Sequence, residues 1–371
     1  MESTLPRRPR VVPGLPVLRR RPDEIQLGLD PRLATVVSGL PEPVVAVVQR
    51  LCGQQGADEL VSELGEHGST LRELLLALAA RGLVEDASRQ AGPVPGRLAG
   101  DQSAAALRAA VDAGHGPDHG GCPAARRGLA IAVEGDGRLA VTVATLLAGA
   151  GVGWVHVQAR GTVRPEDTGT GYLVDDVGRR RSTAAREALL RADGGVRTSR
   201  FGLNNGPDLV VVADAVVPEP GRVAALTSAG VPHLSVRMRD GIGIVGPLVV
   251  PGLTSCLRCA DLQRCDRDEC WPQLAAQLAG KIQPADLASI QATAGLAVGQ
   301  ALDGVRWLKG VAGPPPTCDA SVELDLGTAR VRHRAWPAHP ACSCGAAGRC
   351  SNVAADTTDD LRESGRDGDA S

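Results

Sequence analysis

Residues 129–140 have the sequence LAIAVEGDGRLA, and this stretch decides the fold. Its first five residues are apolar and predict a short buried strand, while residues 139–150 have the periodicity of a helix. Gly135 and Gly137 lie between the two in a G-x-G-x-x-A turn. In that context a nucleotide phosphate can approach backbone N–H groups at a helix N-terminus. The alternative is a turn that only packs the helix against the strand.

More strands and helices follow along the chain. Residues 154–158 and 208–214 predict two further buried strands, and residues 182–192 predict a helix between them. Such alternation is typical of a parallel α/β sheet with crossover helices. We therefore expect an α/β domain over residues 128–350.

Two features of this domain do not fit a dinucleotide-binding site. The second strand is followed by QARG (158–161), without the carboxylate that would bind ribose hydroxyls. Asp136, inside the glycine turn, places a negative charge where a phosphate would lie. Gly135 and Gly137 remain the candidate nucleotide-binding residues.

Residues 1–90 predict a small α+β domain. Two short strands, VLRRR (17–21) and EIQLGL (24–29), precede helices expected at 43–51, 57–64 and 70–81. The last helix has Ser69 as its expected N-cap, Gly82 at its end, and one apolar face formed by Leu71, Leu74, Leu75 and Leu78. With a returning strand at 83–84, this order resembles a winged helix; the alternative is a generic packing domain. We expect a linker over 91–127 and a disordered acidic tail over 351–371.

The composition of the 371-residue chain excludes several classes of function. A net charge of −2 argues against a general nucleic-acid or membrane-surface binder, and 2% aromatic residues supply few stacking platforms for single strands. No apolar run of 18 residues predicts a membrane span, and two prolines interrupt the short apolar run after the basic N-terminus. We expect a cytoplasmic protein, in which ten cysteines favour metal ligation over disulfides.

The order of motifs resembles the ThiF/MoeB/ubiquitin-activating superfamily. The glycine turn is followed by AGVG (150–153), DVGRRRSTAAREAL (176–189), DLVVVADAVVPEPGR (208–222) and GIVGPLVVPGLTSCLRC (243–259), which ends in the first cysteine pair of that superfamily. The resemblance implies a Rossmann-like ThiF-type fold and frequent homodimers. It also implies adenylation of the C-terminal carboxylate of a small carrier or ubiquitin-like protein with ATP and magnesium.

At most of the positions where the superfamily has residues for adenylation, this chain has a different residue type. The ribose-binding acids fall on Ala159 and Gly161, and the phosphate-contacting stretch falls on DTGTG (167–171). The family lysine falls on Arg181, with Arg179 as the other option. If Asp214 matches the family's aspartate within the strand, the magnesium-binding aspartate falls on Val217, which cannot ligate a hard cation. In a second register Asp214 itself would be that ligand. We therefore expect a pseudoenzyme without ATP-dependent adenylation; the alternative is an active adenylyltransferase.

A second and more specific resemblance involves both domains. PGLPVLRR (13–20), QLGLDP (26–31) and GLV (82–84) are similar to stretches of the leader-peptide-binding partner proteins of TOMM (thiazole/oxazole-modified peptide) cyclodehydratases. That resemblance implies a scaffold whose winged helix binds a precursor's leader as an added strand. A separate YcaO-type enzyme would modify the core peptide. A third possibility is a winged-helix DNA-binding regulator, whose phosphate-contacting residues would be Arg7, Arg8, Arg10, Arg19, Arg20 and Arg21. However, the expected recognition helix carries just two arginines, Arg72 and Arg81, that could read base edges.

Four cysteines are candidate metal ligands. Cys256 and Cys259 form one pair and Cys342 and Cys344 the other, which suits a tetrahedral structural zinc ion. The superfamily has a C-x-x-C pair where this chain has C-x-C, so Cys350 is a possible substitute. Unligated core cysteines are the alternative.

Cys52 and Cys122 look incidental, and three further cysteines have no assigned role at this point. They are Cys265, Cys270 and Cys318. The resemblance implies a possible thioester acceptor among them, since relatives that form thioesters use a cysteine in the crossover region. The charges around Cys265 and Cys270 largely cancel, which does not favour a reactive thiolate.

Overall fold

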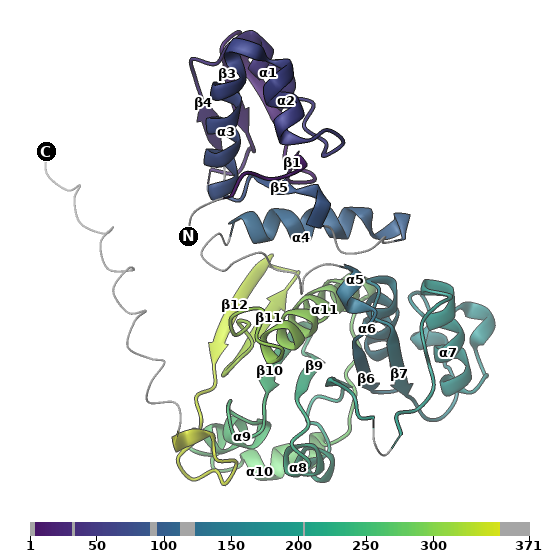
Figure 1. Ribbon diagram of the computed structural model, residues 1–371. Coiled ribbons are helices and arrows are strands. Elements are labelled where there is room, and N and C mark those ends of the chain that lie inside the picture. The colour runs from purple at the N-terminus through teal and green to yellow at the C-terminus, as the bar shows by residue number, and fades with distance from the viewer. Residues whose placement is uncertain (1–3, 32–33, 90–94, 112–122, 203–204, 349–371) are drawn as a thin grey trace, which may run out of the picture. The chain divides into compact units, whose positions relative to one another are not determined.

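A computed structural model describes residues 4–31, 34–89, 95–111, 123–202 and 205–348 of the protein. The chain forms two compact units (Figure 1). The first comprises residues 1–127 with Lys309–Ala312, and the second comprises Gly128–Leu308 with residues from Gly313 onward. The predicted tail, Cys350 and part of the predicted linker lie outside the described residues.

The first unit combines two small sheets with three helices. Strands β2 (Val17–Arg21), β3 (Glu24–Leu27) and β4 (Thr35–Val37) form an antiparallel sheet in that order, and β1 (Pro9–Val11) pairs with β5 (Val84–Asp86). The helices are α1 (Glu42–Val48), α2 (Ala57–Glu63) and α3 (Gly68–Ala80), each within a few residues of its predicted range. This is the small α+β architecture that the sequence predicted.

Helix α3 supplies much of the first unit's core. Its four predicted apolar residues, Leu71 to Leu78, are all buried. The helix ends as predicted: Gly82 has a φ of +69°, and the Leu83 N–H donates to the carbonyl of Leu78 at 2.9 Å. The predicted N-cap was wrong. A 3-10 turn (η1, Gly65–His67) runs directly into α3, so the helix begins at Gly68, ahead of Ser69, and no side chain caps it.

Part of the stretch predicted as a linker is helical. Helix α4 (Ala99–Val111) follows two 3-10 turns, η2 (Ala87–Arg89) and η3 (Gly96–Leu98), and precedes the short helix α5 (Pro123–Arg126). Ala106 and Leu107 of α4 pack against the core of the first unit. Residues 99–111 therefore belong structurally to that unit.

The second unit is built on a seven-stranded sheet with the order β12-β11-β10-β9-β8-β6-β7. Four strands are parallel: β6 (Ala130–Glu134), β7 (Trp154–Gln158), β8 (Leu209–Asp214) and β9 (His233–Arg239). The other three are antiparallel: β10 (Ile242–Val249), β11 (Ala320–Asp325) and β12 (Arg330–Ala335). The Rossmann-like α/β fold is thus confirmed. Three antiparallel strands extend its sheet beyond β9.

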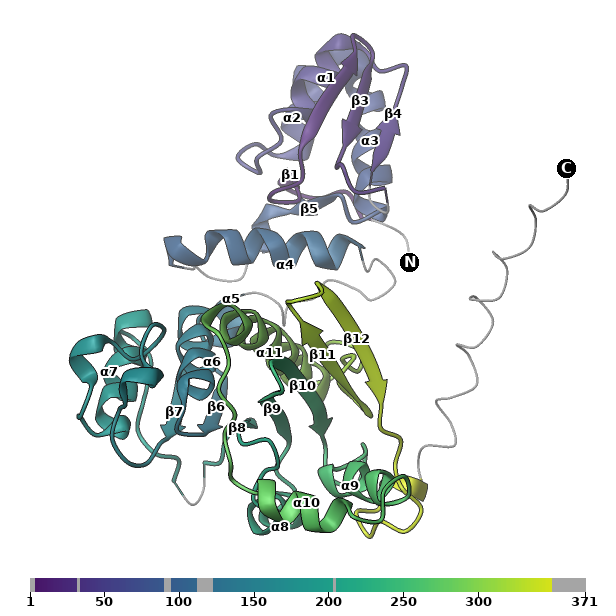
Figure 2. The same cartoon turned by 180° about the vertical axis from the view of Figure 1, so that it is seen from behind.

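Helices cover both faces and one end of this sheet. Helices α6 (Arg138–Gly149), α7 (Arg181–Ala192) and α11 (Leu287–Leu308) share one core with the residues on one face of the sheet. On the other face, Val210 and Val212 of β8 contact Leu226 of α8 (Pro220–Ser228). Figure 2 shows α8 beside α9 (Leu257–Cys265) and α10 (Trp271–Leu278), at the carboxyl ends of the parallel strands. Within the described residues, no helix is long and apolar enough to cross a membrane.

Candidate functional site

The glycine turn has the predicted setting between β6 and α6, but its N–H groups already have an anionic partner. The carboxylate of Asp214, the last residue of β8, accepts hydrogen bonds from the backbone N–H of Gly137 at 2.7 Å and of Ala140 at 3.1 Å. A Cβ on Gly135 would lie 2.5 Å from Asp214 Oδ2, so the turn needs glycine to receive this side chain. The sequence did not predict this contact.

Asp214 is buried in this position and has a φ of +74°. Burial raises the pKa of its carboxyl to about 6, against the opposing effect of the backbone hydrogen bonds from Gly137 and Ala140. At pH 7 such a group is still about nine-tenths ionised. A phosphate at the N-terminus of α6 would therefore meet a carboxylate in place of free N–H groups.

The two candidates for the family lysine are both engaged in ion pairs. Arg181 Nη2 lies 2.6 Å from Asp167 Oδ2, and both side chains are largely buried. Arg179 Nη1 lies 2.5 Å from Asp176 Oδ1, and Arg179 Nη2 lies 2.7 Å from Glu187 Oε1. Neither guanidinium is available to a triphosphate without breaking a pair.

The remaining positions of the ATP site also lack the required groups. Asp136 Oδ1 accepts the backbone N–H of Arg160, so this turn residue binds the end of the second strand. Gly161 has a φ of +74° and turns the chain, and Val217 is buried beyond β8. Val217 supplies no oxygen ligand, and both carboxylate oxygens of Asp214, the magnesium ligand of the second register, already accept N–H groups of the glycine turn.

Tyr172, which the sequence gave no reason to single out, is buried near these charges. Burial raises the pKa of its phenol above the usual range, and the nearby carboxylates of Asp167, Asp214 and Asp136 act in the same direction. The hydroxyl is thus neutral, and it has no hydrogen-bond partner among the described residues. It is the one tyrosine of the chain, so no pattern could have indicated its place.

The four predicted metal-ligating cysteines come together in the second unit. Their sulfur atoms all lie within 4.8 Å of one another. Three of the distances are 3.8 Å (Cys256–Cys259), 3.6 Å (Cys256–Cys342) and 3.5 Å (Cys259–Cys344). Four thiolates at about 2.3 Å from a tetrahedral zinc ion are about 3.8 Å apart. The described residues therefore form a complete four-sulfur site without Cys350.

Two separate segments build this site. Cys256 is the N-cap of α9 and Cys259 lies in its first turn, so the positive end of the helix dipole faces the sulfurs. The second pair follows β12, where the Cys342 N–H donates to the carbonyl of His339 at 2.9 Å. Burial raises the pKa of the Cys342 thiol to about 11, so a metal ion binding there would displace a proton.

The three unassigned cysteines lie outside this cluster. Burial raises the pKa of Cys318 to about 12, with Asp319 adding to the effect, so this thiol is protonated at neutral pH. Cys265 is partly buried and Cys270 is exposed. Cys270 is the N-cap residue of α10, and Cys265 is the last residue of α9.

No protein-family model matches the sequence, and no curated protein matches it. Solved structures match its fold. E. coli MccB bound to ATP is 14% identical with a TM-score of 0.64, and the match covers 91% of this chain and 99% of MccB. MccB with AMPCPP and MccA gives a TM-score of 0.65 at the same identity and coverage. PaaA is 18% identical with a TM-score of 0.62, over 87% of this chain and 98% of PaaA. The chain therefore has the ThiF-like fold that its motifs predicted.

Proposed function

We propose that the protein is a ThiF-like scaffold that binds a precursor peptide through its first unit and presents it to a separate YcaO-type cyclodehydratase. In this proposal it has no adenylation activity of its own. The observation that carries the proposal is the Asp214 carboxylate on the N–H groups of Gly137 and Ala140. Because it holds the donors that a phosphate would use, the turn serves the fold and not a nucleotide.

Strand β4 is the edge of the first unit that suits an incoming peptide. The two edge strands of its sheet are β2 and β4. Strand β2 carries Arg19, Arg20 and Arg21, and charged side chains discourage pairing at an edge. Strand β4 carries no charge, and its Val36 is 44% exposed. Backbone hydrogen bonds at this edge would supply affinity, and side-chain pockets would supply selectivity.

The charges of the first unit favour a peptide over nucleic acid as the partner. Arg10 is paired with Glu85, and Arg19 Nη2 lies 2.7 Å from Glu42 Oε2. On the expected recognition helix, Arg72 Nη2 lies 2.8 Å from Asp58 Oδ1. Arginines that are already paired with carboxylates contribute little to phosphate binding.

A structural zinc ion completes the proposal. The four-sulfur cluster supplies every position of a tetrahedral zinc site, so no coordination position remains for substrate or water. The ion would tie α9 to the segment after β12, two parts of the second unit that are far apart in sequence. We assign it no catalytic role.

Calorimetric titration of the zinc-loaded protein with Mg-ATP tests the non-catalytic part. We expect no binding, and no AMP or pyrophosphate when ATP is incubated with the protein alone. E. coli MccB, which has been crystallised with ATP, is the positive control. Binding together with release of AMP and pyrophosphate would overturn the proposal and establish an adenylyltransferase.

A further inference from the structure

A cavity of about 1240 Å³ lies in the second unit, at the carboxyl ends of β8 and β9. Its walls come from the segment after β8, from β9, and from helices α8, α9 and α10, which lie together in both views (Figures 1 and 2). Open α/β sheets bind ligands in crevices at this end of their parallel strands. The volume exceeds the roughly 300–1,000 Å³ of ordinary small-molecule pockets, so it can hold a short chain segment.

The lining of this cavity contains six arginines and three aspartates. The arginines are Arg237, Arg239, Arg258, Arg264, Arg267 and Arg334, and the acids are Asp240, Asp261 and Asp268. Asp261 is paired with Arg264 at 2.7 Å, and Glu323 of β11 lies 3.5 Å from Arg239 and 3.6 Å from Arg334. Across the described ranges, Arg237, Arg258 and Arg267 have no carboxylate at ion-pair distance. These three guanidiniums are therefore the ones in the lining that a carboxylate could bind without displacing an ion pair.

Arg237 is the innermost of these three arginines, with 4% of its surface exposed. Its guanidinium donates to Ser235 Oγ at 2.8 Å and to the carbonyl of Gly246 at 3.3 Å, both of which are neutral. Burial lowers its pKa to about 9, with Arg264 and Arg239 adding to the effect, so it remains cationic at pH 7. A buried charge without a counterion is unfavourable, and an anionic ligand would relieve it.

The rest of the lining includes apolar side chains and three cysteines of the four-sulfur site, Cys256, Cys342 and Cys344. Val216, Val217 and Val223 contribute from the segment after β8 and from α8, and Leu278 and Trp271 contribute from α10. The glycine turn is not part of the lining. A ligand that matches both surfaces carries carboxylates and apolar side chains together, which describes an acidic peptide segment better than it describes a nucleotide.

We propose that this cavity binds an acidic segment of a peptide, with carboxylates on Arg237, Arg258 and Arg267 and apolar side chains against Val217 and Leu278. The planar guanidinium fork suits a carboxylate because it can donate two parallel hydrogen bonds. The inference deepens the proposed function, on which it rests, by naming the chemistry of the peptide that the second unit would accept. It places one contact with the peptide on each unit.

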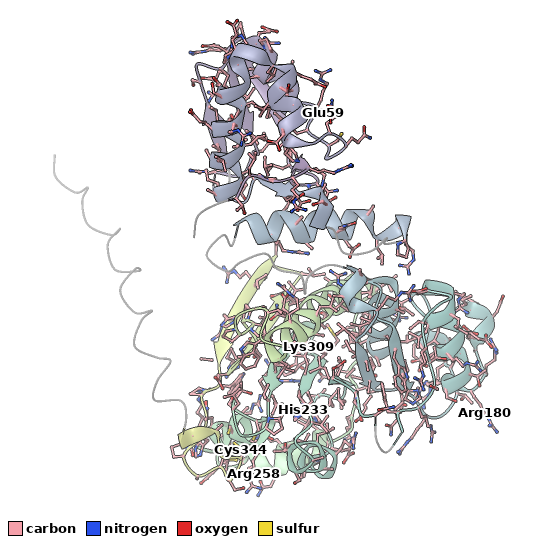
Figure 3. All side chains as sticks on the ribbon, in the orientation of Figure 1. Glu59, Arg180, His233, Arg258, Lys309 and Cys344 are labelled. Atoms are coloured by element: carbon pink, nitrogen blue, oxygen red, sulfur yellow. The ribbon has the colours of Figure 1, made fainter. Side chains whose placement is uncertain are left out.

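The test measures fluorescence anisotropy with two labelled six-residue peptides, one of alternating Glu and Leu and one of alternating Gln and Leu. The protein is the full chain loaded with zinc. Arg258 and Arg267 are both exposed, so the variants R258A/R267A and R267A remove cavity charge without touching the core. Arg258 lies in the same part of the second unit as Cys344, so zinc content is measured for every variant (Figure 3). Arg180, before α7 and away from Arg258 in Figure 3, supplies the matched control R180A.

We expect the Glu-Leu peptide to bind at least about tenfold more tightly than the Gln-Leu peptide, since charge-assisted hydrogen bonds are lost in the latter. R258A/R267A should weaken Glu-Leu binding by about tenfold or more, R267A by less, and R180A should leave it unchanged. Equal binding of the two peptides, an equal loss in R180A, or full displacement of the Glu-Leu peptide by ATP would overturn the inference.

A first-unit variant separates this inference from the proposed function. Val36→Lys adds a charge to the β4 edge and should leave the binding of the Glu-Leu peptide intact if the cavity is its site. If Val36→Lys abolishes binding and R258A/R267A does not, the acidic peptide binds the first unit. In that case the cavity inference is wrong while the proposed function stands.

Discussion

Replacing Asp214 with Asn tests the carboxylate at the glycine turn directly. Asparagine has nearly the same shape and tolerates the positive φ of +74° at this position. It has no charge, so the exchange removes the titration of this side chain while keeping the backbone. The informative quantity is the difference in unfolding free energy between the two proteins as pH changes, because titrations common to both cancel.

The magnitude follows from the pKa of Asp214, which burial raises from 3.8 to about 6 in the folded protein. The folded state therefore binds the proton more tightly than the unfolded state does. The stabilising contribution is fully present below about pH 3.8 and is lost as pH rises through about 6. Between pH 4.5 and 7, the unfolding free energy of the wild type should fall by about 2 kcal/mol relative to Asp214→Asn.

Tryptophan fluorescence during denaturant unfolding is the assay, because all four tryptophans of the chain lie in the second unit. The matched control is Asp325→Asn, at an exposed turn where the hydrogen bond from Thr328 lowers the carboxyl pKa. There the carboxylate form is favoured by folding, so stability is lost as pH falls, which is the opposite sign. A wild-type–Asp214→Asn difference that stays constant from pH 4.5 to 7 would refute the reasoning.

Three further predictions concern the metal, the buried ion pair and the first unit. Cys256→Ser should lower bound zinc from about one ion per chain to none, with a lower temperature of thermal unfolding, as measured by elemental analysis and calorimetry. Asp167→Asn should cost about 3 kcal/mol in denaturant unfolding, because it leaves the Arg181 guanidinium largely buried without its carboxylate. Gly68→Ala should destabilise the first unit by more than about 1 kcal/mol, seen as faster hydrogen exchange in α2 and α3, because the added Cβ would lie 2.4 Å from the carbonyl oxygen of Val61.

Three of the four parallel strands, β6, β7 and β8, could be predicted from the sequence, whereas β9 was not among the predictions. Strand β7 has the predicted bounds, and β8 differs from its prediction by one residue. Strands covered on both faces are short apolar runs, and such runs are visible without knowing their partners. The antiparallel strands could not be predicted in this way. Strand β12 (RVRHRA) is an exposed edge strand without an apolar run, and the apolar pattern of β10 does not show whether its neighbour is parallel or antiparallel.

The candidate sites also differ in whether the sequence could predict them. The cysteine cluster could be predicted because two closely spaced pairs of cysteines are typical of a structural metal site. The partner of Arg181 could not, since Asp167 is one of many acids in the chain and only the fold brings the two together. The arginine-lined cavity was missed for the same reason: Arg237 and Arg334 come from strands far apart in sequence.

Under the proposed function, Asp214 explains how a nucleotide-type turn persists without a nucleotide. The N–H groups of Gly137 and Ala140 lie at a helix N-terminus inside the protein, and buried donors without partners cost about 1–3 kcal/mol each. In a nucleotide enzyme the phosphate satisfies such donors when it binds. Here a carboxylate from the end of β8 satisfies them permanently, and the raised pKa of Asp214 measures the desolvation that this arrangement costs. The turn is thereby stable with no ligand, which is the condition that a scaffold must meet and an ATP-dependent enzyme need not.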